Sequence, residues 1–222
     1  MSNTNANTFL GMYKMHVLDS SQARIMLGIP LGNTLGSLLD VGAGDGNVTL
    51  QLAPLFDDVL AVEASKWCVY RLKEKGIKCA QSDDLSSLST SGFDVVSCLN
   101  VLDRCSRPIS LLHEIKRRLK PATGLALLAV VLPFQPFVET GALGRTSRPT
   151  ESLGLGPSMG WEESVNQLVS GVLEPAGFEI ERLARVPYLC QGDTDTPYYS
   201  LDDAIFVLRA SKSDITSART PT

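Results

Sequence analysis

Short apolar runs alternate with amphipathic segments along most of the chain, and this alternation predicts a parallel sheet flanked by helices. The predicted strands are the apolar runs at residues 37–41, 59–62, 77–80, 94–99, 125–132, 178–187 and 204–208. The predicted helices are the segments 46–53, 65–75, 109–119 and 161–173. Strands buried on both faces are apolar throughout, and helical segments between them are typical of a doubly wound α/β sheet. The last two strands follow each other without a helix, which suits an antiparallel pair.

The segments outside this pattern predict the domain organisation. The Asn- and Thr-rich residues 1–8 and the polar residues 211–222 are predicted to be disordered, which leaves one domain over residues 9–210. Residues 9–36 are expected to form a helical extension in front of the sheet. The Gly-, Ser- and Pro-rich residues 140–160 are predicted to form a mobile loop, of a length that usually carries a function or is disordered.

The composition narrows the possible function classes. The chain has 222 residues, of which 44% are hydrophobic, and a net charge of -4 without a basic stripe, which argues against nucleic acid as a partner. No run of 18 apolar residues occurs, so no membrane span is predicted. The five cysteines form no C-x-x-C pair and there are only two histidines, so no metal site is expected. We expect an intracellular, cytoplasmic monomer with reduced thiols.

Residues 38–46 (LLDVGAGDG) are the most informative stretch, because an apolar strand leads into three glycines within five residues. Gly42, Gly44 and Gly46 allow positive φ and a close approach of the backbone to a ligand. The dinucleotide-binding pattern G-x-G-x-x-G requires Gly or Ala at the position where this chain has Asn47. The G-x-G-x-G spacing after a strand that carries an acid instead favours S-adenosylmethionine (SAM) over NAD.

Five acids lie near this loop or at the ends of the next two strands. Glu63 ends the second strand, 19 residues after the middle glycine, and its carboxylate can accept two hydrogen bonds from a ribose diol. Asp40 either orients the loop or meets the ammonium group of SAM. Asp45 either caps the following helix or contacts the ligand. Asp83 and Asp84 follow the third strand, where one of them contacts the adenine region or both are solvated loop acids.

The fourth strand ends in the sequence Ser97-Cys98-Leu99-Asn100-Val101-Leu102-Asp103. Ligands of open parallel sheets bind beyond the carboxyl ends of the strands, so Asn100 and Asp103 are expected beside the sulfonium of SAM. The alternative for Asp103 is that it caps the helix that begins near Arg107. The Asn/Asp-Pro-Pro-aromatic motif of nucleic-acid amino methyltransferases does not follow this strand, which disfavours that substrate class.

Together with the glycine stretch, four further segments form a specific pattern, at residues 96–105, 131–139, 187–193 and 198–204. With them the chain resembles, over residues 9–208, the DREV family of protein-histidine N-methyltransferases, which act on the pros nitrogen of His-x-His motifs. The resemblance implies a class I, Rossmann-like fold of seven mostly parallel strands with an antiparallel last strand. It also implies SAM as cofactor, S-adenosyl-L-homocysteine as product, and proteins or peptides with His-x-His motifs as substrates.

The resemblance also implies roles for individual residues. The residue matching Asn100 lies at the junction of SAM and substrate, and those matching Asp103 and Tyr199 lie at the target imidazole and near the substrate. The other predicted substrate contacts are Arg104, Phe134, Phe137, Glu139 and Tyr188. Among these, the two phenylalanines and Glu139 either wall the substrate site or form a lid over the core.

Two features depart from the family pattern. Gln135 stands where we expect His in the animal members, and the composition of residues 140–160 is unlike theirs. Because a fold does not determine its substrate, methylation of a small molecule under a loop that closes as a lid is the alternative. A SAM-fold module without catalysis and an NAD oxidoreductase are the remaining candidates.

Overall fold

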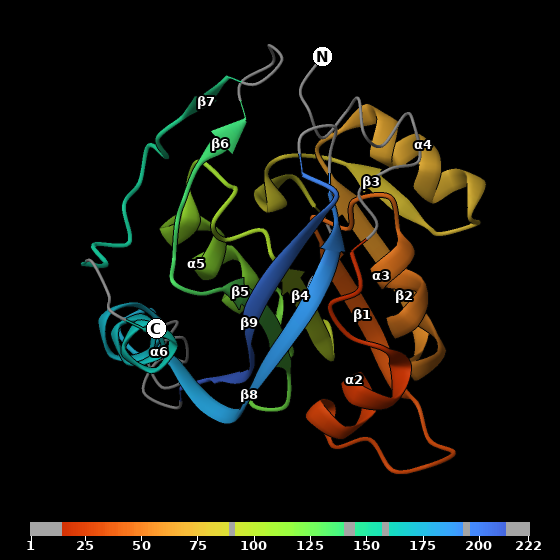
Figure 1. Ribbon diagram of the computed structural model, residues 1–222. Coiled ribbons are helices and arrows are strands. Elements are labelled where there is room, and N and C mark those ends of the chain that lie inside the picture. Colours follow the sequence, from red (N-terminus) through yellow and green to blue (C-terminus); the bar gives the residue numbers. More distant parts are fainter. Residues whose placement is uncertain (1–14, 89–91, 140–144, 157–159, 193–195, 212–222) are drawn as a thin grey trace, which may run out of the picture.

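The computed structural model describes residues 15–88, 92–139, 145–156, 160–192 and 196–211, and a seven-stranded sheet forms its centre (Figure 1). The spatial order of the strands is β3-β2-β1-β4-β5-β9-β8. They are β1 (Leu35–Val41), β2 (Phe56–Glu63), β3 (Cys79–Gln81), β4 (Val95–Leu99), β5 (Leu125–Val131), β8 (Phe178–Gln191) and β9 (Tyr198–Ala210). Strands β1 to β5 are parallel, and β9 is antiparallel to both of its neighbours. The predicted fold class and the antiparallel last strand are thus confirmed.

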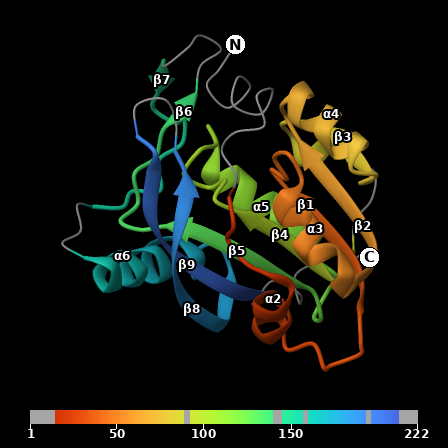
Figure 2. The same ribbon diagram turned by 45° about the vertical axis from the view of Figure 1, so that its right-hand side comes forward.

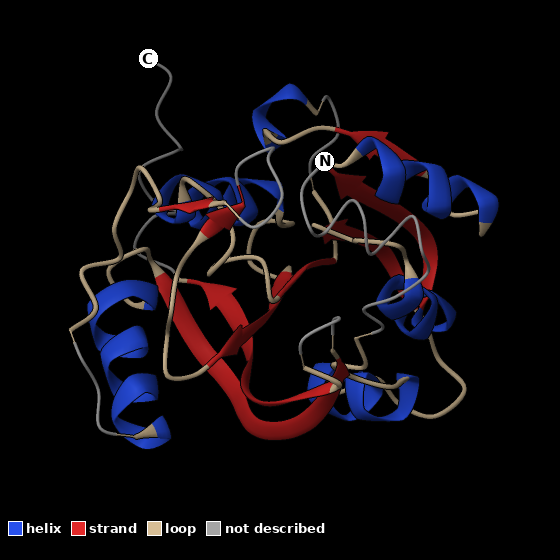
Figure 3. Cartoon of the chain, turned by 45° about the horizontal axis from the view of Figure 1, so that its top comes forward, coloured by secondary structure: helices blue, strands red, loops and turns tan. Residues whose placement is uncertain are grey.

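Helices surround the sheet, as Figure 3 shows with helices in blue and strands in red. They are α2 (Ser20–Leu27), α3 (Asn47–Leu52), α4 (Lys66–Glu74), α5 (Pro108–Arg118) and α6 (Trp161–Leu168), with short turns η1 (Ala53–Leu55), η2 (Leu85–Ser87) and η3 (Val169–Leu173). Asp19 begins α2 with a capping box that includes Gln22, and the Ser65 hydroxyl accepts the Cys68 N–H at the start of α4. These local hydrogen bonds satisfy backbone donors that a helix start leaves unpaired.

The side chains of alternate strand residues pack into two separate hydrophobic cores, one on each face of the sheet. Leu39 and Val41 of β1 belong to the core that includes α5 and α6, whereas Leu38 belongs to the core that includes α2 and Leu52 of α3. Successive side chains of a strand point to opposite faces, so an apolar run fills both cores. In Figure 2, α6 lies on one side of β8 and β9, and α2 and α3 lie on the other. Both faces of the sheet are therefore covered by helices.

Two regions extend beyond their predicted limits. The predicted strands 178–187 and 204–208 are the central parts of β8 and β9, which pair over their whole lengths from Phe178↔Ala210 to Gln191↔Tyr198. The additional residues include polar ones such as Gln191, Ser200 and Asp202, so no long apolar run marks them as strand. Each strand provides the hydrogen-bonding partners of the other, and this pairing exists only in the folded chain.

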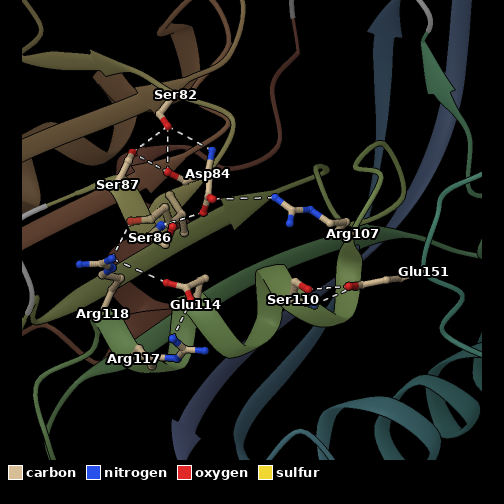
Figure 4. Close-up of polar contacts among 11 residues, drawn as sticks. Ser82, Asp84, Ser86, Ser87, Arg107, Ser110, Glu114, Arg117, Arg118 and Glu151 are labelled. Carbon is tan, nitrogen blue, oxygen red and sulfur yellow. Dashed lines mark hydrogen bonds and ion pairs between the residues drawn. The ribbon is translucent and has the colours of Figure 1, made fainter.

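The segment predicted to be a mobile loop contains ordered contacts where it is described. Strand β7 (Thr146–Ser147) pairs with β6 (Val138–Glu139), at the top of Figure 1. Further along, the Thr150 N–H donates to the Ser106 carbonyl at 2.9 Å, and Glu151 accepts hydrogen bonds from Ser110 at the start of α5 (Figure 4). The mobility of residues 140–160 stays a prediction, since residues 140–144 and 157–159 lie outside the described residues.

Two further findings concern the described part of the chain. No helix in it combines the length and the apolarity needed to cross a lipid bilayer. All five cysteines lie within it, and none of them forms a disulfide. The predicted disordered termini, residues 1–8 and all but the first residue of 211–222, fall outside it.

Candidate active site

The carboxyl ends of the parallel strands meet at one edge of the sheet. The last residue of β1, Val41, pairs with Val62 of β2 and with Cys98 of β4, so the loops that follow these strands begin side by side. The N–H groups of Gly42 and Ala43 both point to the Val62 carbonyl, at 2.8 and 3.3 Å. This edge is where an open parallel sheet binds its ligand.

All three glycines of the loop have positive φ, but they differ in whether the surrounding protein leaves room for a side chain. A Cβ on Gly42 would lie 2.4 Å from Val101 Cγ2, and one on Gly46 would lie 2.7 Å from Leu72 Cδ2, so packing excludes a side chain at both positions. Gly44 has φ +57°, and a Cβ there would meet no atom of the described protein within 4 Å. The loop therefore presents bare backbone to open space at its middle glycine, which is what close approach of a ligand requires.

Glu63 is held rigidly beside this open backbone. Its Oε2 accepts the Gly44 N–H at 2.9 Å, and its Oε1 accepts the Ser65 N–H at 2.8 Å. Each carboxylate oxygen has a second lone pair, so both can still accept a hydrogen bond from a diol. The ribose role of Glu63 stays a prediction, and the geometry of the carboxylate suits it.

Asp40 is engaged within the protein. Its side chain is 3% exposed, and its two oxygens accept hydrogen bonds from the Thr49 hydroxyl at 2.6 Å and the Ser97 hydroxyl at 2.7 Å. Burial raises the pKa of this carboxyl above its ordinary value, while the two hydroxyl bonds lower it. Asp40 thus links β1 to α3 and β4, which favours its alternative role in orienting the loop.

Asp45 is likewise tied to its neighbours. It accepts hydrogen bonds from the Asn47 backbone N–H at 3.1 Å and side-chain amide at 2.7 Å, and Lys75 Nζ lies 3.1 Å from its Oδ2. Lys75 also donates to the Asp45 carbonyl at 2.6 Å. This arrangement holds the start of α3 against the end of α4. The N-cap of α3 is Gly46 and no side chain caps this helix, so the alternative that Asp45 is its cap is wrong, and its contact with a ligand stays a prediction.

The two acids after β3 differ in their surroundings. Asp84 accepts the Ser86 N–H at 2.9 Å at the start of η2, and Arg107 Nη2 lies 3.9 Å from its Oδ2 (Figure 4). The hydrogen bonds from Ser86 lower the pKa of Asp84. Asp83 is exposed on the same turn. Of the two, Asp83 is the more exposed, and the adenine contact of either acid stays a prediction.

The turn that carries these acids is held in place by α5. Arg118 donates to the carbonyls of Leu85 at 2.6 Å and Leu88 at 2.9 Å, and it lies 3.6 Å from the Glu114 carboxylate. Figure 4 shows this network between η2 and the last turn of the helix. The turn that follows β3 is thus held in place by α5, which begins at Pro108, five residues after Asp103.

Asn100 is constrained at the end of β4. It has φ +57°, a left-handed conformation that asparagine tolerates better than most side chains. Its N–H donates to the Ala129 carbonyl of β5 at 2.9 Å, and its Nδ2 donates to Asp203 Oδ2 of β9 at 2.9 Å. Two different strands therefore determine where this side chain lies.

Asp103 is buried next to a cation and an aromatic ring. Its side chain is 2% exposed, and burial raises its pKa. Arg104 Nε lies 3.2 Å from Asp103 Oδ2, and the Arg104 guanidinium lies 3.8 Å from the ring centroid of Phe137. Asp103 Oδ1 is buried without a hydrogen-bond partner among the described residues. Because Arg107 is the N-cap of α5 and no side chain caps that helix, the alternative that Asp103 is a helix cap is wrong.

Asp203 is a site residue that the sequence analysis did not single out. It is 0% exposed, and its Oδ1 also lacks a hydrogen-bond partner among the described residues. Burial raises its pKa to about 7, and the nearby charge of Asp103 acts in the same direction. The available signal was an acid directly before the apolar run 204–208, although nothing local indicates that this position is buried.

The other predicted substrate residues lie on three elements of this edge. Phe134 packs against the core and also lines a pocket of about 230 Å³, and its role as a wall of the substrate site stays a prediction. Glu139 lies in β6, and the Phe137 N–H before it donates to the Asp103 carbonyl at 2.9 Å. Tyr199 precedes Asp203 by four positions on β9, so the two share a face of the strand. Tyr188 lies opposite Leu201 in the β8–β9 pair.

The polar side chains of this edge include carboxylates and an amide, and the described residues form no metal-binding cluster. No group of three or more His, Cys, Asp or Glu side chains in the described ranges is arranged to hold a metal ion. The carboxylates divide into two sets, one around the glycine loop and one made of Asp103, which follows β4, and Asp203, which lies within β9.

Comparison with known sequences identifies the family. The DREV methyltransferase family matches residues 1–210. The mitochondrial ubiquinone biosynthesis O-methyltransferase of Saccharomyces cerevisiae is 27% identical over 108 residues, which cover 43% of this chain and 33% of the yeast protein. A ubiquinone biosynthesis O-methyltransferase of Xanthomonas oryzae is 30% identical over 98 residues, which cover 40% and 41%. The chain thus spans less than half the length of the curated relatives it matches.

Solved structures share the fold at low sequence identity. The precorrin-6y C5,15-methyltransferase of Geobacter metallireducens has a TM-score of 0.54 at 15% identity, over 90% of this chain and 93% of that chain. The [4+2]-cyclase SpnF has a TM-score of 0.56 at 16% identity, over 93% and 91%. A SAM-dependent methyltransferase of Leishmania major has a TM-score of 0.54 at 13% identity, over 86% and 71%. These likenesses establish the Rossmann-like fold, and the family match over residues 1–210 establishes that the chain belongs to the DREV methyltransferases, a family of SAM-dependent enzymes.

Proposed function

We propose that this protein transfers the methyl group of SAM to the pros nitrogen of histidine in His-x-His motifs. The observation that carries the proposal is the buried Asp103, which lies near a second buried carboxylate, Asp203, at the end of β4. A nitrogen nucleophile becomes a cation when it is methylated, and carboxylates in a buried site stabilise a developing positive charge. An acidic site of this kind therefore suits imidazole.

The glycine-loop side of the edge fits SAM. The bare backbone at Gly44 would lie along the cofactor, Glu63 would accept the ribose hydroxyls, and Asp83 would meet the adenine edge. Asn100 would lie between cofactor and substrate. When bound there, SAM supplies a methyl group on a positively charged sulfur, which is the electrophile of the reaction.

Asp103 would orient the substrate imidazole. A neutral imidazole has one N–H and one lone pair, so a carboxylate that accepts the tau N–H directs the pros lone pair the other way. The new N–C bond forms as the S–C bond breaks, and that electron pair remains on sulfur. The tau proton stays on the ring, which becomes an imidazolium next to Asp103. Because free histidine has a pKa near ~6.5, its ring needs no strong base at neutral pH.

A peptide substrate explains the second histidine of the motif. In an extended peptide, alternate side chains point the same way, so both imidazoles of His-x-His face the protein. One ring would enter the site at Asp103, and the other would lie in the pocket of about 230 Å³ that Phe134 lines. That pocket combines Phe134 with polar side chains, namely Gln135, Ser164 and Gln167.

Methylation of a small molecule is the second candidate, and the names of the curated O-methyltransferase relatives favour it. The buried carboxylates argue against oxygen as the nucleophile here. A phenol attacks as its anion or while losing its proton, and carboxylates at the reacting atom repel that charge. The acidic pair therefore ranks histidine above a phenol.

The test is methyl transfer from SAM to the peptide Ala-His-Ala-His, with fragmentation and NMR to assign the methylated nitrogen. Pros-methylhistidine is the expected product. A matched peptide with tau-methylhistidine at the target position lacks the N–H for Asp103 and is expected to stay unmodified. Binding of S-adenosyl-L-homocysteine without any transfer to either peptide would contradict the histidine proposal and favour the small-molecule candidate.

A further inference from the structure

We infer that Asp203 is a positioning residue, whose carboxylate holds the Asn100 carboxamide in one orientation at the junction of cofactor and substrate. The inference rests on the proposed function for its role in turnover. The contact itself, from Asn100 Nδ2 to Asp203 Oδ2 at 2.9 Å, joins residues 103 positions apart in the sequence.

Asn100 needs such a restraint because its backbone conformation is uncommon. Its φ of +57° lies in the left-handed region, which persists at functional sites only where surrounding contacts impose it. The hydrogen bond from its N–H to the Ala129 carbonyl fixes the backbone alone. The contact with Asp203 fixes the side chain. Above a pH of about 7, where the Asp203 carboxyl is ionised, it only accepts hydrogen bonds, so it determines that the amide nitrogen, and not the amide oxygen, faces β9.

Asp203 is well placed to act as a fixed acceptor. Its backbone pairs with Val131 of β5 on one side and with Val186 of β8 on the other, so it lies inside the sheet. With a side chain that is 0% exposed, the carboxylate has no route to solvent and stays beside Asn100. The five residues that follow, 204–208, are all apolar and buried.

Burial of this carboxylate destabilises the fold, which indicates that its position serves the site. An acid of this kind is costly to bury unless it is fully hydrogen-bonded, and Asp203 Oδ1 has no partner among the described residues. An apolar residue at 203 would continue the pattern of the strand. The one hydrogen bond that Asp203 makes to a described side chain is with Asn100. The experiment therefore tests whether turnover depends on that hydrogen bond.

The experiment is a double-mutant cycle between Asp203→Ala and Asn100→Ala, with kcat, KM and S-adenosyl-L-homocysteine affinity measured on the His-x-His peptide. Asp203→Ala is expected to lower kcat about tenfold and to change KM little, since one fixed orientation is lost. In the Asn100→Ala background, Asp203→Ala is expected to cause no further loss. Independent, multiplicative losses would overturn the inference.

Two variants separate positioning from general damage. Asp203→Asn keeps an acceptor for Asn100 and is expected to retain at least a third of the wild-type kcat, whereas a loss equal to that of Asp203→Ala would overturn the inference. Asp202→Asn removes the same charge one position away, at a side chain that pairs with Arg185 and does not contact Asn100. It is the matched control, and its kcat is expected to stay within twofold of wild type.

A substrate-free measurement keeps this inference distinct from the proposed function. The side-chain NH2 signals of Asn100 in a 15N NMR spectrum are expected to be protected from proton exchange in the wild type and in Asp203→Asn. Loss of that protection is expected in Asp203→Ala. If the wild-type protein fails to methylate the peptide, the proposed function fails, and the NMR result still decides whether Asp203 holds Asn100. Equal protection in all three proteins would overturn the inference.

Discussion

The carboxylates at the two halves of the sheet edge differ in how completely the protein satisfies them. At the glycine loop, both oxygens of Asp40 and both of Glu63 accept hydrogen bonds from the chain. In the other half, Asp103 after β4 and Asp203 within β9 are as deeply buried as Asp40, yet each has one oxygen without a partner in the described part of the chain. The half proposed to hold the cofactor is thus complete in itself, whereas the half proposed to hold the substrate has carboxylate oxygens that the proposed imidazole would pair with.

The difference has an energetic meaning. A buried acceptor without a partner costs roughly 1–3 kcal/mol, and most such groups in native proteins are satisfied. Asp103 and Asp203 are two such acceptors close together, and natural proteins accept a loss of stability of this kind where function needs it. Substitutions of the two unsatisfied acids are therefore expected to leave the fold as stable as before or more stable, whereas substitutions of the satisfied acids are expected to destabilise it.

The largest expected effect comes from Asp103→Asn. It removes the negative charge that the proposed imidazolium requires, and it leaves only a neutral amide oxygen as acceptor, so kcat is expected to fall about a thousandfold. S-adenosyl-L-homocysteine affinity, measured by calorimetry, is expected to stay within about threefold, since no cofactor contact changes. Unchanged turnover would remove Asp103 from the mechanism.

Asp94→Asn is the matched control for that variant. Asp94 precedes β4 at its opposite end, and it pairs with Lys120 at 2.7 Å and accepts the Ser37 N–H at 2.8 Å. Its loss is expected to lower the free energy of unfolding by about 1–2 kcal/mol while kcat is preserved. A similar loss of kcat in both variants would show that the contrast between the two ends of the strand is wrong.

The second effect is the pH dependence of stability. The pKa of Asp203 is raised to about 7 in the fold, so the folded state binds more protons than the unfolded state between roughly pH 4 and pH 7. The contribution of this group to stability is therefore present at low pH and is lost as pH rises through about 7. Asp203→Asn is expected to be more stable than wild type at pH 8, by up to roughly 4 kcal/mol.

Urea unfolding of the two proteins at pH 4 and pH 8 measures this difference. The gap in unfolding free energy is expected to be present at pH 8 and small at pH 4. A gap that is constant across this range would mean that Asp203 titrates normally, and the two carboxylate sets would then differ less than their burial indicates.

The third effect separates the glycines. Gly44→Ala and Gly32→Ala both place a side chain at positive φ in open space, so each is expected to cost roughly 1–2 kcal/mol of stability. Only Gly44 faces the proposed cofactor, so its variant is expected to lose about tenfold in S-adenosyl-L-homocysteine affinity as well. Equal affinities in the two variants would place the cofactor elsewhere.

The smallest effect concerns the acids after β3. Asp83→Asn is expected to weaken S-adenosyl-L-homocysteine binding about threefold, because one hydrogen bond at an exposed adenine edge becomes weaker. Asp84→Asn is expected to leave the affinity unchanged, because Asp84 is bonded to Ser86. Calorimetry on both variants checks this, and the reverse ranking would assign the adenine contact to Asp84.

Local patterns were sufficient for most of the fold. Buried parallel strands are continuous apolar runs, so β1, β4 and β5 were predicted close to their observed limits. The outer parts of β8 and β9, residues 188–191 and 198–202, were missed, because they pair with each other and not with β5. A polar strand has no apolar period, and its existence depends on a partner that is distant in the sequence.

The sequence by itself determined the strands and helices, the glycine loop with Glu63 nearby, and the residues that carry the family resemblance. These features depend on short-range periodicity and on the backbone conformations that each residue allows. Only the tertiary structure decided which acids the protein satisfies and which it leaves to a ligand. The contacts that decide this join Asp40 to Ser97 and Asn100 to Asp203, across 57 and 103 positions. The burial and the hydrogen bonds of a carboxylate depend on residues that are near in space but distant in the sequence. The local sequence around the acid therefore does not predict them.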